Sequence, residues 1–240
     1  MIEFRPINDV DPALAHSPLV RATEKTFAYI AEHDSIGLTP SMAFKRNFVH
    51  WAAAEFEWPQ HTADDLFKLN KVLNEADFLP LLVLHDLLIH LRIGRHYRGA
   101  FRLTRAGEEL VGKPGKIFGI LTPFFLFEVN HSSYARFNDE PLGNWDIFLN
   151  VLNVEAEDGL SAEEFAQLLY GKESGDAMRI MTVRSILYSH VLRPLCWAGL
   201  LSEHRSGRGF LATRTFIKTP LWKTALRLTT DSTVTRAVRH

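Results

Sequence analysis

The spacing of apolar residues along the chain predicts a mainly helical protein. Val20, Phe27 and Ile30, for example, recur near the spacing of one helix face. The segments with such a pattern are residues 20–32, 40–56, 63–73, 78–93, 114–127, 145–152, 162–170 and 178–198.

Local start and stop signals accompany several of these patterns. Thr39 followed by Pro40 pairs an N-cap hydroxyl with a proline suited to the first turn. Ser161 with Glu164 three residues later forms a capping box. In the long pattern over 178–198, Pro194 predicts a kink or a break.

Two basic, glycine-containing segments interrupt the helical pattern, and each is predicted to form a β-hairpin. RHYRGAFRLTR occupies residues 95–105, with Gly99 at the turn and alternating residues after it. HRSGRGFLATR occupies residues 204–214 and has the same arginine-and-glycine character. Each follows an apolar helical segment, so the chain contains two similar helix-and-hairpin arrangements.

The similarity between the two hairpins predicts an internal duplication. An offset of 109 residues aligns Phe101 with Phe210 and Thr104 with Thr213. We therefore expect a mainly α protein with small β-hairpins, of the α+β class, built from two units in tandem. The expected segments are an N-terminal arm (1–19), a first unit with a following apolar helix (20–136), a linker (137–144), a second unit (145–228) and a flexible tail (229–240).

Composition narrows the class of protein. The 240 residues include one cysteine, Cys196, which excludes an internal disulfide framework. The sequence has no uninterrupted apolar stretch of membrane-spanning length and no recognisable secretory signal, so we expect a cytoplasmic protein without membrane contact.

The net charge of −1 conceals an uneven distribution of charge. Residues 90–116 carry 7 basic and 2 acidic side chains, and residues 203–240 carry 8 and 2. The intervening and preceding segments are acidic. Both predicted hairpins therefore lie in basic segments, which favours a negatively charged partner.

The stretches LHDLLIHLRIGRHYRGAFRLTRAGEEL and VLRPLCWAGLLSEHRSGRGFLATR resemble the last helix and the wing of bacterial winged helix-turn-helix domains. The first contains the Leu-Thr-x-x-Gly pattern of such wings at residues 103–107. The second departs from it, with Phe216 where the first has Gly107. The resemblance covers residues 20–112 and 143–220, and it implies two winged-helix units in tandem.

This resemblance implies a protein that binds double-stranded DNA, as a bacterial regulator of transcription or of a mobile element. Winged helices commonly place a helix in the major groove and the wing along the phosphate backbone. The expected DNA-binding residues are Arg95, Arg98, Arg102 and Arg105 in the first wing, Thr182, Ser185, Ser189 and Arg193 on the helix of the second unit, and Arg205, Arg208 and Arg214 in the second wing. The alternatives are that the helix stripe is a solvated face and that the wings are solvated hairpins.

The helix predicted over 78–93 favours a second function. It is apolar nearly all round, so we expect it to be covered by residues 117–127 or by a second subunit. A homodimer through this helix, or a winged-helix module that binds a protein and no DNA, is the alternative.

The sequence shows no set of residues arranged for catalysis, and we expect neither an enzyme nor a cofactor. The sequence contains no glycine-rich phosphate loop and no HExxH motif. His85, Asp86 and His90 are conceivable metal ligands, but a spacing of five suits one helix face poorly. We expect these histidines to be satisfied core or boundary residues and predict no metal site.

Overall fold

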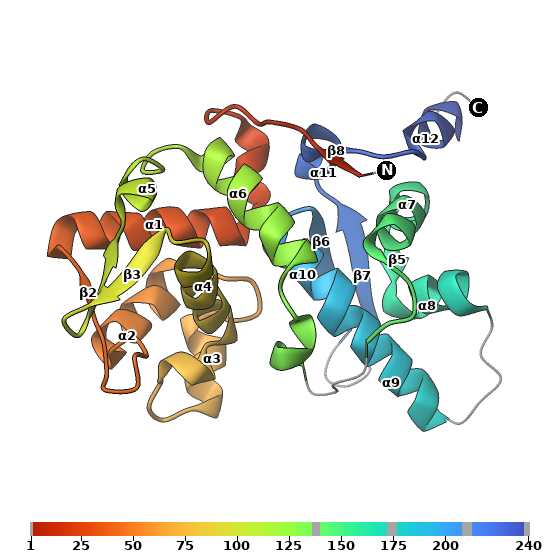
Figure 1. Ribbon diagram of the computed structural model, residues 1–240. Helices are drawn as coiled ribbons and strands as arrows, with labels where there is room; N and C mark the ends of the chain where they lie inside the picture. The colour runs from red at the N-terminus through yellow and green to blue at the C-terminus, as the bar shows by residue number, and fades with distance from the viewer. Residues whose placement is uncertain (1, 136–139, 172–176, 208–212, 238–240) are drawn as a thin grey trace. The chain divides into compact units, whose positions relative to one another are not determined.

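The computed structural model describes residues 2–135, 140–171, 177–207 and 213–237. The chain divides into two compact units, and Figure 1 colours their elements by residue number. Asn8–Leu121 form the N-terminal unit, and Met1–Ile7 with Thr122–His240 form the C-terminal unit. Helices predominate and the sheets are small, which confirms the α+β class and the presence of two units.

The N-terminal unit contains one three-stranded antiparallel sheet among its helices. Its elements are η1 (Pro12–His16), α1 (Pro18–His33), β2 (Ile36–Gly37), α2 (Arg46–Glu55), α3 (Ala63–Leu69), η2 (Glu75–Asp77), α4 (Leu79–His90), β3 (Gly94–Tyr97), β4 (Ala100–Leu103), α5 (Arg105–Glu108) and the start of α6 (Pro114–Phe127). Its strands lie in the order β2-β4-β3.

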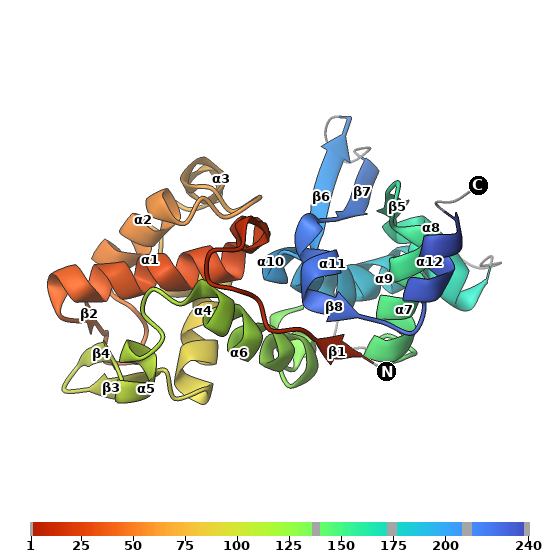
Figure 2. The same ribbon diagram turned by 90° about the horizontal axis from the view of Figure 1, so that it is seen from above.

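The C-terminal unit contains a second three-stranded sheet and a short two-stranded one. Its elements are β1 (Glu3–Phe4), the end of α6, η3 (His131–Tyr134), α7 (Trp145–Glu155), β5 (Leu160–Ser161), α8 (Ala162–Tyr170), α9 (Ala177–Leu187), the π-helix η4 (Tyr188–Leu192), α10 (Arg193–Ala198), β6 (Leu201–Ser206), β7 (Thr213–Lys218), α11 (Pro220–Ala225), β8 (Leu226–Arg227) and α12 (Asp231–Ala237). The strands lie in the orders β5-β7-β6 and β1-β8. Figure 2 shows β6 and β7 side by side as one hairpin.

The two three-stranded sheets have the same order of elements along the chain. In each unit a helix leads to a short strand, several helical segments follow, and a hairpin closes the sheet with its second strand in the middle. The central strands carry equivalent buried phenylalanines, since Phe101 pairs with Ile36 and Phe216 pairs with Leu160. Both phenylalanine side chains are fully buried, so they occupy the same place in the two cores.

A threonine ends each central strand in the same way. The hydroxyl of Thr104 donates a hydrogen bond to the Arg92 carbonyl, and that of Thr219 to the Gly199 carbonyl, each at 2.6 Å. Arg92 and Gly199 both have left-handed backbones, with φ of 55° and 84°. Each threonine also caps the short helix that follows it.

These equivalences correct the predicted repeat. Phe101 corresponds to Phe216 and not to Phe210, so the central strands are offset by 115 residues. The first strands of the hairpins are offset by 107, because His96 lies opposite Phe101 and Glu203 lies opposite Phe216. The second hairpin is therefore eight residues longer, and a single offset of 109 could not fit both strands.

The first hairpin closes through a two-residue turn. Tyr97 pairs with Ala100, and Arg98 and Gly99 between them have φ of 49° and 72°. Two consecutive positive φ values are typical of the type I′ turn, whose twist matches that of the flanking strands. The predicted turn at Gly99 is confirmed. In the second hairpin residues 208–212 lie outside the described part of the chain.

Several boundaries between the predicted segments differ from those in the structure. The units divide within α6, between Leu121 and Thr122, whereas residues 140–144 of the predicted linker lie inside the C-terminal unit. The cause is packing, because Phe125 near the end of α6 stacks on Trp197 of the C-terminal unit. The predicted N-terminal arm is also divided, since β1 pairs with β8 of the C-terminal unit and α1 begins at Pro18.

Two further expectations need correction. Thr39 and Pro40 start no helix: the Thr39 hydroxyl bonds to Ala43 in a turn, and α2 begins at Arg46. Residues 231–237 of the tail predicted to be flexible form α12, which contacts α7. Among the described residues no helix combines the length and apolar character needed to cross a membrane.

Helix α4 is largely buried, as its apolar sequence predicts. It contacts α1, η2 and β3 of its own unit. The burial expected from a second subunit is therefore supplied in large part within the N-terminal unit, which removes the main reason to expect a dimer through this helix.

Candidate functional site

The first hairpin displays a cluster of exposed arginines. Arg95 and Arg102 lie directly opposite each other on β3 and β4, and Arg98 stands at the turn. The guanidinium carbons of Arg95 and Arg98 lie 5.5 and 5.1 Å from the centre of the Tyr97 ring. Within the described part of the chain, no carboxylate forms an ion pair with Arg95, Arg98 or Arg102. These three charges are therefore held close together without neutralisation.

Arg105 differs from these three residues. It lies in α5, and its Nε is 3.3 Å from the Glu109 Oε1 in an exposed i,i+4 pair. Such a pair contributes only about 0.3–0.5 kcal/mol, so it leaves the arginine able to turn to another partner. The structure thus brings three of the four predicted arginines of the first hairpin together and places the fourth beside a carboxylate.

An open pocket of about 520 Å³ adjoins this hairpin. Arg95 and Arg102 line one side, and Asp34 and Glu108 also contribute. The remaining lining residues are Phe27, Ile30, Ala31, Leu103 and Val111, from α1, β4 and the segment after α5. The pocket holds both charge signs, so it is not selective for an anion by charge alone.

A chain of hydrogen bonds lies on the other face of the hairpin. His85 of α4 contacts the Glu75 Oε1 through its Nδ1 at 2.6 Å, and the His96 Nε2 of β3 through its Nε2 at 2.8 Å. The Glu75 Oε2 accepts a hydrogen bond from the Phe44 backbone N–H at 2.7 Å. Glu75 and His85 are buried, whereas His96 reaches solvent. The chain therefore connects a buried carboxylate to the protein surface.

Ring packing fixes His85 in this position. Phe44 stacks on its imidazole at 3.8 Å between ring centres, and Phe101 packs edge-on at 5.3 Å. Burial and the neighbouring His85 lower the pKa of His96, while Glu75 acts in the opposite direction. The contact between two Nε2 atoms requires one to donate and the other to accept, so at most one of the two rings is doubly protonated.

The second hairpin presents its arginines differently. Arg205 and Arg214 also lie opposite each other. Both guanidinium groups, however, face the Glu203 carboxylate, with Nε to Oε1 distances of 2.9 and 3.6 Å. Arg214 also lies over the Tyr188 ring at 4.8 Å. Arg208, the third arginine predicted there, lies outside the described residues.

Glu203 also accepts a hydrogen bond from the preceding helical segment. Its side chain is only 4% exposed, and its Oε2 accepts a hydrogen bond from the Tyr188 hydroxyl at 3.2 Å. Burial and the Glu203 charge raise the pKa of Tyr188 to about 12. The carboxylate thus compensates the charge of the second hairpin, and the pair Arg205 and Arg214 is less available to an external anion than the pair Arg95 and Arg102.

The polar stripe predicted on the long helix of the C-terminal unit does not form one accessible face. Thr182 and Ser185 are half-buried. Ser189 is buried, and its hydroxyl donates to the Ser185 carbonyl at 2.9 Å. The Arg193 guanidinium donates to the Tyr134 carbonyl at 3.1 Å and lies 5.2 Å from the Trp197 ring centre. Ser189 and Arg193 therefore have partners inside the unit and contribute little to an accessible face.

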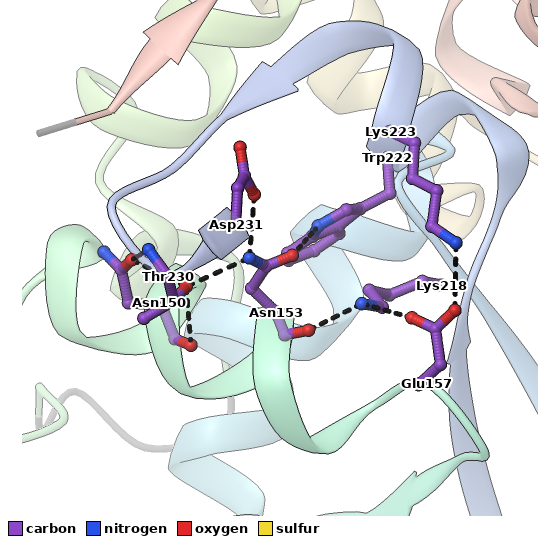
Figure 3. A network of polar contacts seen from close by, with 8 residues as sticks. All are labelled: Asn150, Asn153, Glu157, Lys218, Trp222, Lys223, Thr230 and Asp231. Atoms are coloured by element: carbon purple, nitrogen blue, oxygen red, sulfur yellow. Dashed lines mark hydrogen bonds and ion pairs between the residues drawn. The ribbon is translucent and has the colours of Figure 1, made fainter. Parts of the chain in front are cut away.

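The polar network of Figure 3 has a structural role in the C-terminal unit. The buried Asn153 accepts a hydrogen bond from the Trp222 Nε1 at 2.9 Å and donates to the Asp231 Oδ1 at 2.9 Å. Lys218 bridges the Asn153 carbonyl and the Glu157 carboxylate, each at 2.6 Å. The two lysine partners, Lys218 and Lys223, lower the pKa of Glu157. All of these groups have partners within the unit, which ties α7 to the C-terminal segment.

Several residues of these clusters were missed by the sequence prediction. His85 was considered with Asp86 and His90, but its partners are Glu75, ten residues earlier, and His96 across the hairpin. Glu203 was not distinguished from other acidic residues of the chain. Only the alternation along β6 pointed to it, because a carboxylate opposite a buried phenylalanine must face inward.

The fold and these clusters define a two-domain α+β protein with a duplicated three-stranded unit and basic hairpins. The chain belongs to the Y4jL family. Residues 15–116 match the family model described as Y4jL N-terminal domain, and residues 135–220 match the y4jL C-terminal domain.

A relative from Sinorhizobium fredii (strain NBRC 101917 / NGR234), described as uncharacterized protein y4jL, is 40% identical over 195 residues. The match covers 80% of this chain and 87% of the relative. No solved structure matches the chain. Each family model covers one of the two repeated units, which agrees with the division of the fold into two units.

Proposed function

We propose that the protein binds double-stranded DNA through the first hairpin, as a bacterial regulator of transcription or of a mobile element. The observation that carries this proposal is the cluster Arg95, Arg98 and Arg102, which is exposed and free of ion pairs with described carboxylates. Closely spaced cations without local partners interact favourably with successive phosphates and release the counterions condensed on DNA.

The order of elements supports the same proposal. Each unit runs helix, strand, several helical segments and hairpin, with the strands of the sheet in the order first, third, second. This order would suit a winged helix. In that arrangement the hairpin is the wing, and wings commonly contact the phosphate backbone. The buried α4 does not suit base contacts, so the proposed contact in the N-terminal unit is with phosphates and not with base edges.

In the C-terminal unit the proposal narrows to fewer residues. Thr182 and Ser185 remain candidates for DNA contacts, whereas Ser189 and Arg193 do not. Arg205 and Arg214 would have to exchange Glu203 for phosphate. We therefore assign the main share of the affinity to the first hairpin.

Fluorescence anisotropy with random duplex DNA, at about 50 and 200 mM salt, tests the proposal. If the three arginines each contact a phosphate, their contribution to affinity falls about fortyfold across that range. Replacing Arg95, Arg98 and Arg102 by glutamine should lower the affinity and flatten its salt dependence by that factor.

The matched control removes three exposed positive charges elsewhere in the same unit, through glutamine at Lys68, Lys71 and Lys116. This variant should lose much less affinity than the hairpin variant. Equal losses of affinity in the two variants would show that the effect comes from net charge alone. An unchanged affinity of the hairpin variant would refute the proposal that the hairpin binds DNA.

A protein-interaction module is the second candidate, because apolar side chains on and after α3 are exposed. Phe67, Leu69 and Val72 are 41%, 86% and 47% exposed. Contiguous exposed apolar residues favour a protein partner or a second copy of the chain. Light scattering of the purified protein, with Leu69→Ser as the comparison, should show a smaller mass for the variant if this surface is used for self-association.

A further inference from the structure

The convergence of His85 and His96 has a use that the proposed function does not require. Their Nε2 atoms point at one another across 2.8 Å, at the place where β3 lies against α4. We propose that these two nitrogens form a binding site for a divalent transition-metal ion of the zinc or cobalt type. The remaining coordination positions of this site would be filled by water.

The surroundings of His85 match those of a metal-ligating histidine. Such a histidine commonly donates its second ring N–H to a carboxylate, which fixes the tautomer and the ring orientation. Here the His85 Nδ1 lies 2.6 Å from the Glu75 Oε1, so Glu75 directs the lone pair of the opposite nitrogen toward His96. Glu75 is only 2% exposed and is itself anchored by the Phe44 N–H, so it cannot easily turn away.

The geometry needs only a small adjustment to admit an ion. Two imidazole nitrogens on a tetrahedral zinc ion, each at about 2.0–2.1 Å, lie about 3.3 Å apart. The two Nε2 atoms, now 2.8 Å apart, would therefore have to move apart by roughly 0.5 Å to bind such an ion. His85 is fixed by the stacked Phe44 ring, whereas His96 is exposed on a short hairpin, so His96 would make the movement.

The donor set determines the class of ion. Imidazole nitrogens suit Zn²⁺, Co²⁺, Ni²⁺ and Cu²⁺, whereas Mg²⁺ and Ca²⁺ prefer oxygen ligands. The described residues contain no cluster of three or more histidine, cysteine or carboxylate side chains arranged to hold a metal. The site would therefore have two protein ligands and open positions, with an affinity below that of a closed structural site.

Cobalt absorption spectroscopy and zinc calorimetry on the full-length protein, without DNA, test this inference. We expect Co²⁺ to give visible absorption bands, which an ion bound only to water lacks at comparable strength, and Zn²⁺ to bind with one site per chain. His96→Gln should remove both signals, and because His96 is exposed this variant should still fold. Glu75→Gln should weaken binding about 10- to 100-fold, as loss of a carboxylate partner does at other metal sites.

His90→Gln is the matched control, since His90 is an exposed histidine on the same helix whose Nδ1 is bonded to the Asp86 carbonyl. This variant should bind both ions as the wild type does. Wild-type protein that binds neither ion at millimolar concentration would overturn the inference and leave a hydrogen bond between the two histidines. Binding that His96→Gln leaves unchanged would also overturn it. A failure here leaves DNA binding untouched, because the two assays use different ligands and different residues.

Discussion

The two hairpins occupy equivalent places in their units but differ in how their charge is treated. In the first, Arg95 and Arg102 face each other without a carboxylate partner among the described residues. In the second, Arg205 and Arg214 face each other over the buried Glu203. The comparison indicates that the duplicated unit fixes strand order and core packing, while the charge at the hairpin is free to change.

One pair of equivalent positions makes the difference concrete. His96 lies opposite Phe101, and Glu203 lies opposite Phe216. Both side chains bond to a polar residue of the preceding helical segment, His85 in one unit and Tyr188 in the other. The same position of the hairpin therefore carries an imidazole in the unit whose arginines lack carboxylate partners among the described residues and a carboxylate in the unit whose arginines are paired.

The largest expected effect tests whether the two cores are equivalent. Phe101→Ala and Phe216→Ala each remove a fully buried ring at the same point of the sheet. Each should lower the free energy of unfolding of its own unit by about 3–5 kcal/mol. Hydrogen exchange should show the loss in residues 8–121 for the first variant and in residues 122–237 for the second.

Phe67→Ala is the control, because this ring is 41% exposed and should cost little. If one of the two core variants lost as little stability as this control, the two phenylalanines would not hold equivalent places in the two cores. The proposed equivalence of the two units would then be wrong at these positions.

The second prediction uses a difference between buried histidines. His85 is paired with Glu75, whereas His131 of the C-terminal unit is buried near Arg193. Burial, and after it the positive charge of Arg193, lower the pKa of His131 to about 4. Since the unfolded chain keeps the ordinary value of 6.5, it binds the proton first as the pH falls.

The stability of the C-terminal unit should therefore fall between about pH 6.5 and pH 4, by about 3 kcal/mol from this group, and change little from it above or below that window. Urea unfolding at several pH values measures the slope. His131→Phe should make the dependence of stability on pH less steep, whatever that variant does to stability at pH 7. The variant His50→Gln, at an exposed histidine, should keep the slope of the wild type. An equally steep slope in His131→Phe would assign the effect to other groups.

Local signals in the sequence predicted much of this fold. Ser161 with Glu164 forms the capping box of α8, and Gly99 forms the hairpin turn, because caps and tight turns are set by residues a few positions apart. The prediction at Thr39 and Pro40 failed for the same local reason. A hydroxyl before a proline can begin a turn as well as a helix, and here it forms the turn.

The candidate sites were less predictable because they depend on contacts across the fold. The stripe from Thr182 to Arg193 assumed a regular helix, but the π-helix at Tyr188–Leu192 adds backbone to one turn and rotates the residues after it. Ser189 lies within the π-helix and is buried, and Arg193, the first residue after it, donates a hydrogen bond to the Tyr134 carbonyl. The hydrogen bonds among Glu75, His85 and His96 join three elements, and the spacing of these residues along the chain does not predict them.

The third prediction seeks to erase the difference between the hairpins. Glu203→Gln removes the carboxylate that pairs with Arg205 and Arg214 and keeps a side chain of the same shape, able to accept the Tyr188 hydrogen bond. If DNA binding is governed by unpaired arginines, the variant should bind random duplex about tenfold more tightly at low salt, with a steeper salt dependence.

Glu157→Gln is a fair comparison, because it removes a carboxylate of the same unit whose partners are Lys218 and Lys223 and lies away from the arginine pair. Its effect on binding should be smaller. Weaker binding by Glu203→Gln would mean that the carboxylate organises the second hairpin for its ligand, and the contrast between neutralised and free arginines would lose its functional meaning.

The smallest expected effect separates the shape of the first hairpin from its charge. Arg98 occupies the first position of the two-residue turn with φ of 49°, a conformation that asparagine adopts more readily than arginine. Arg98→Asn should therefore raise the stability of the N-terminal unit by a few tenths of a kcal/mol, roughly, since asparagine before glycine is a preferred type I′ sequence. The variant should nevertheless bind DNA about threefold more weakly at 200 mM salt, because one phosphate contact is lost. Gains in both stability and affinity would show that the turn conformation limits binding more than the charge at residue 98 does. Such a result would reassign the role of the cluster to Arg95 and Arg102 alone.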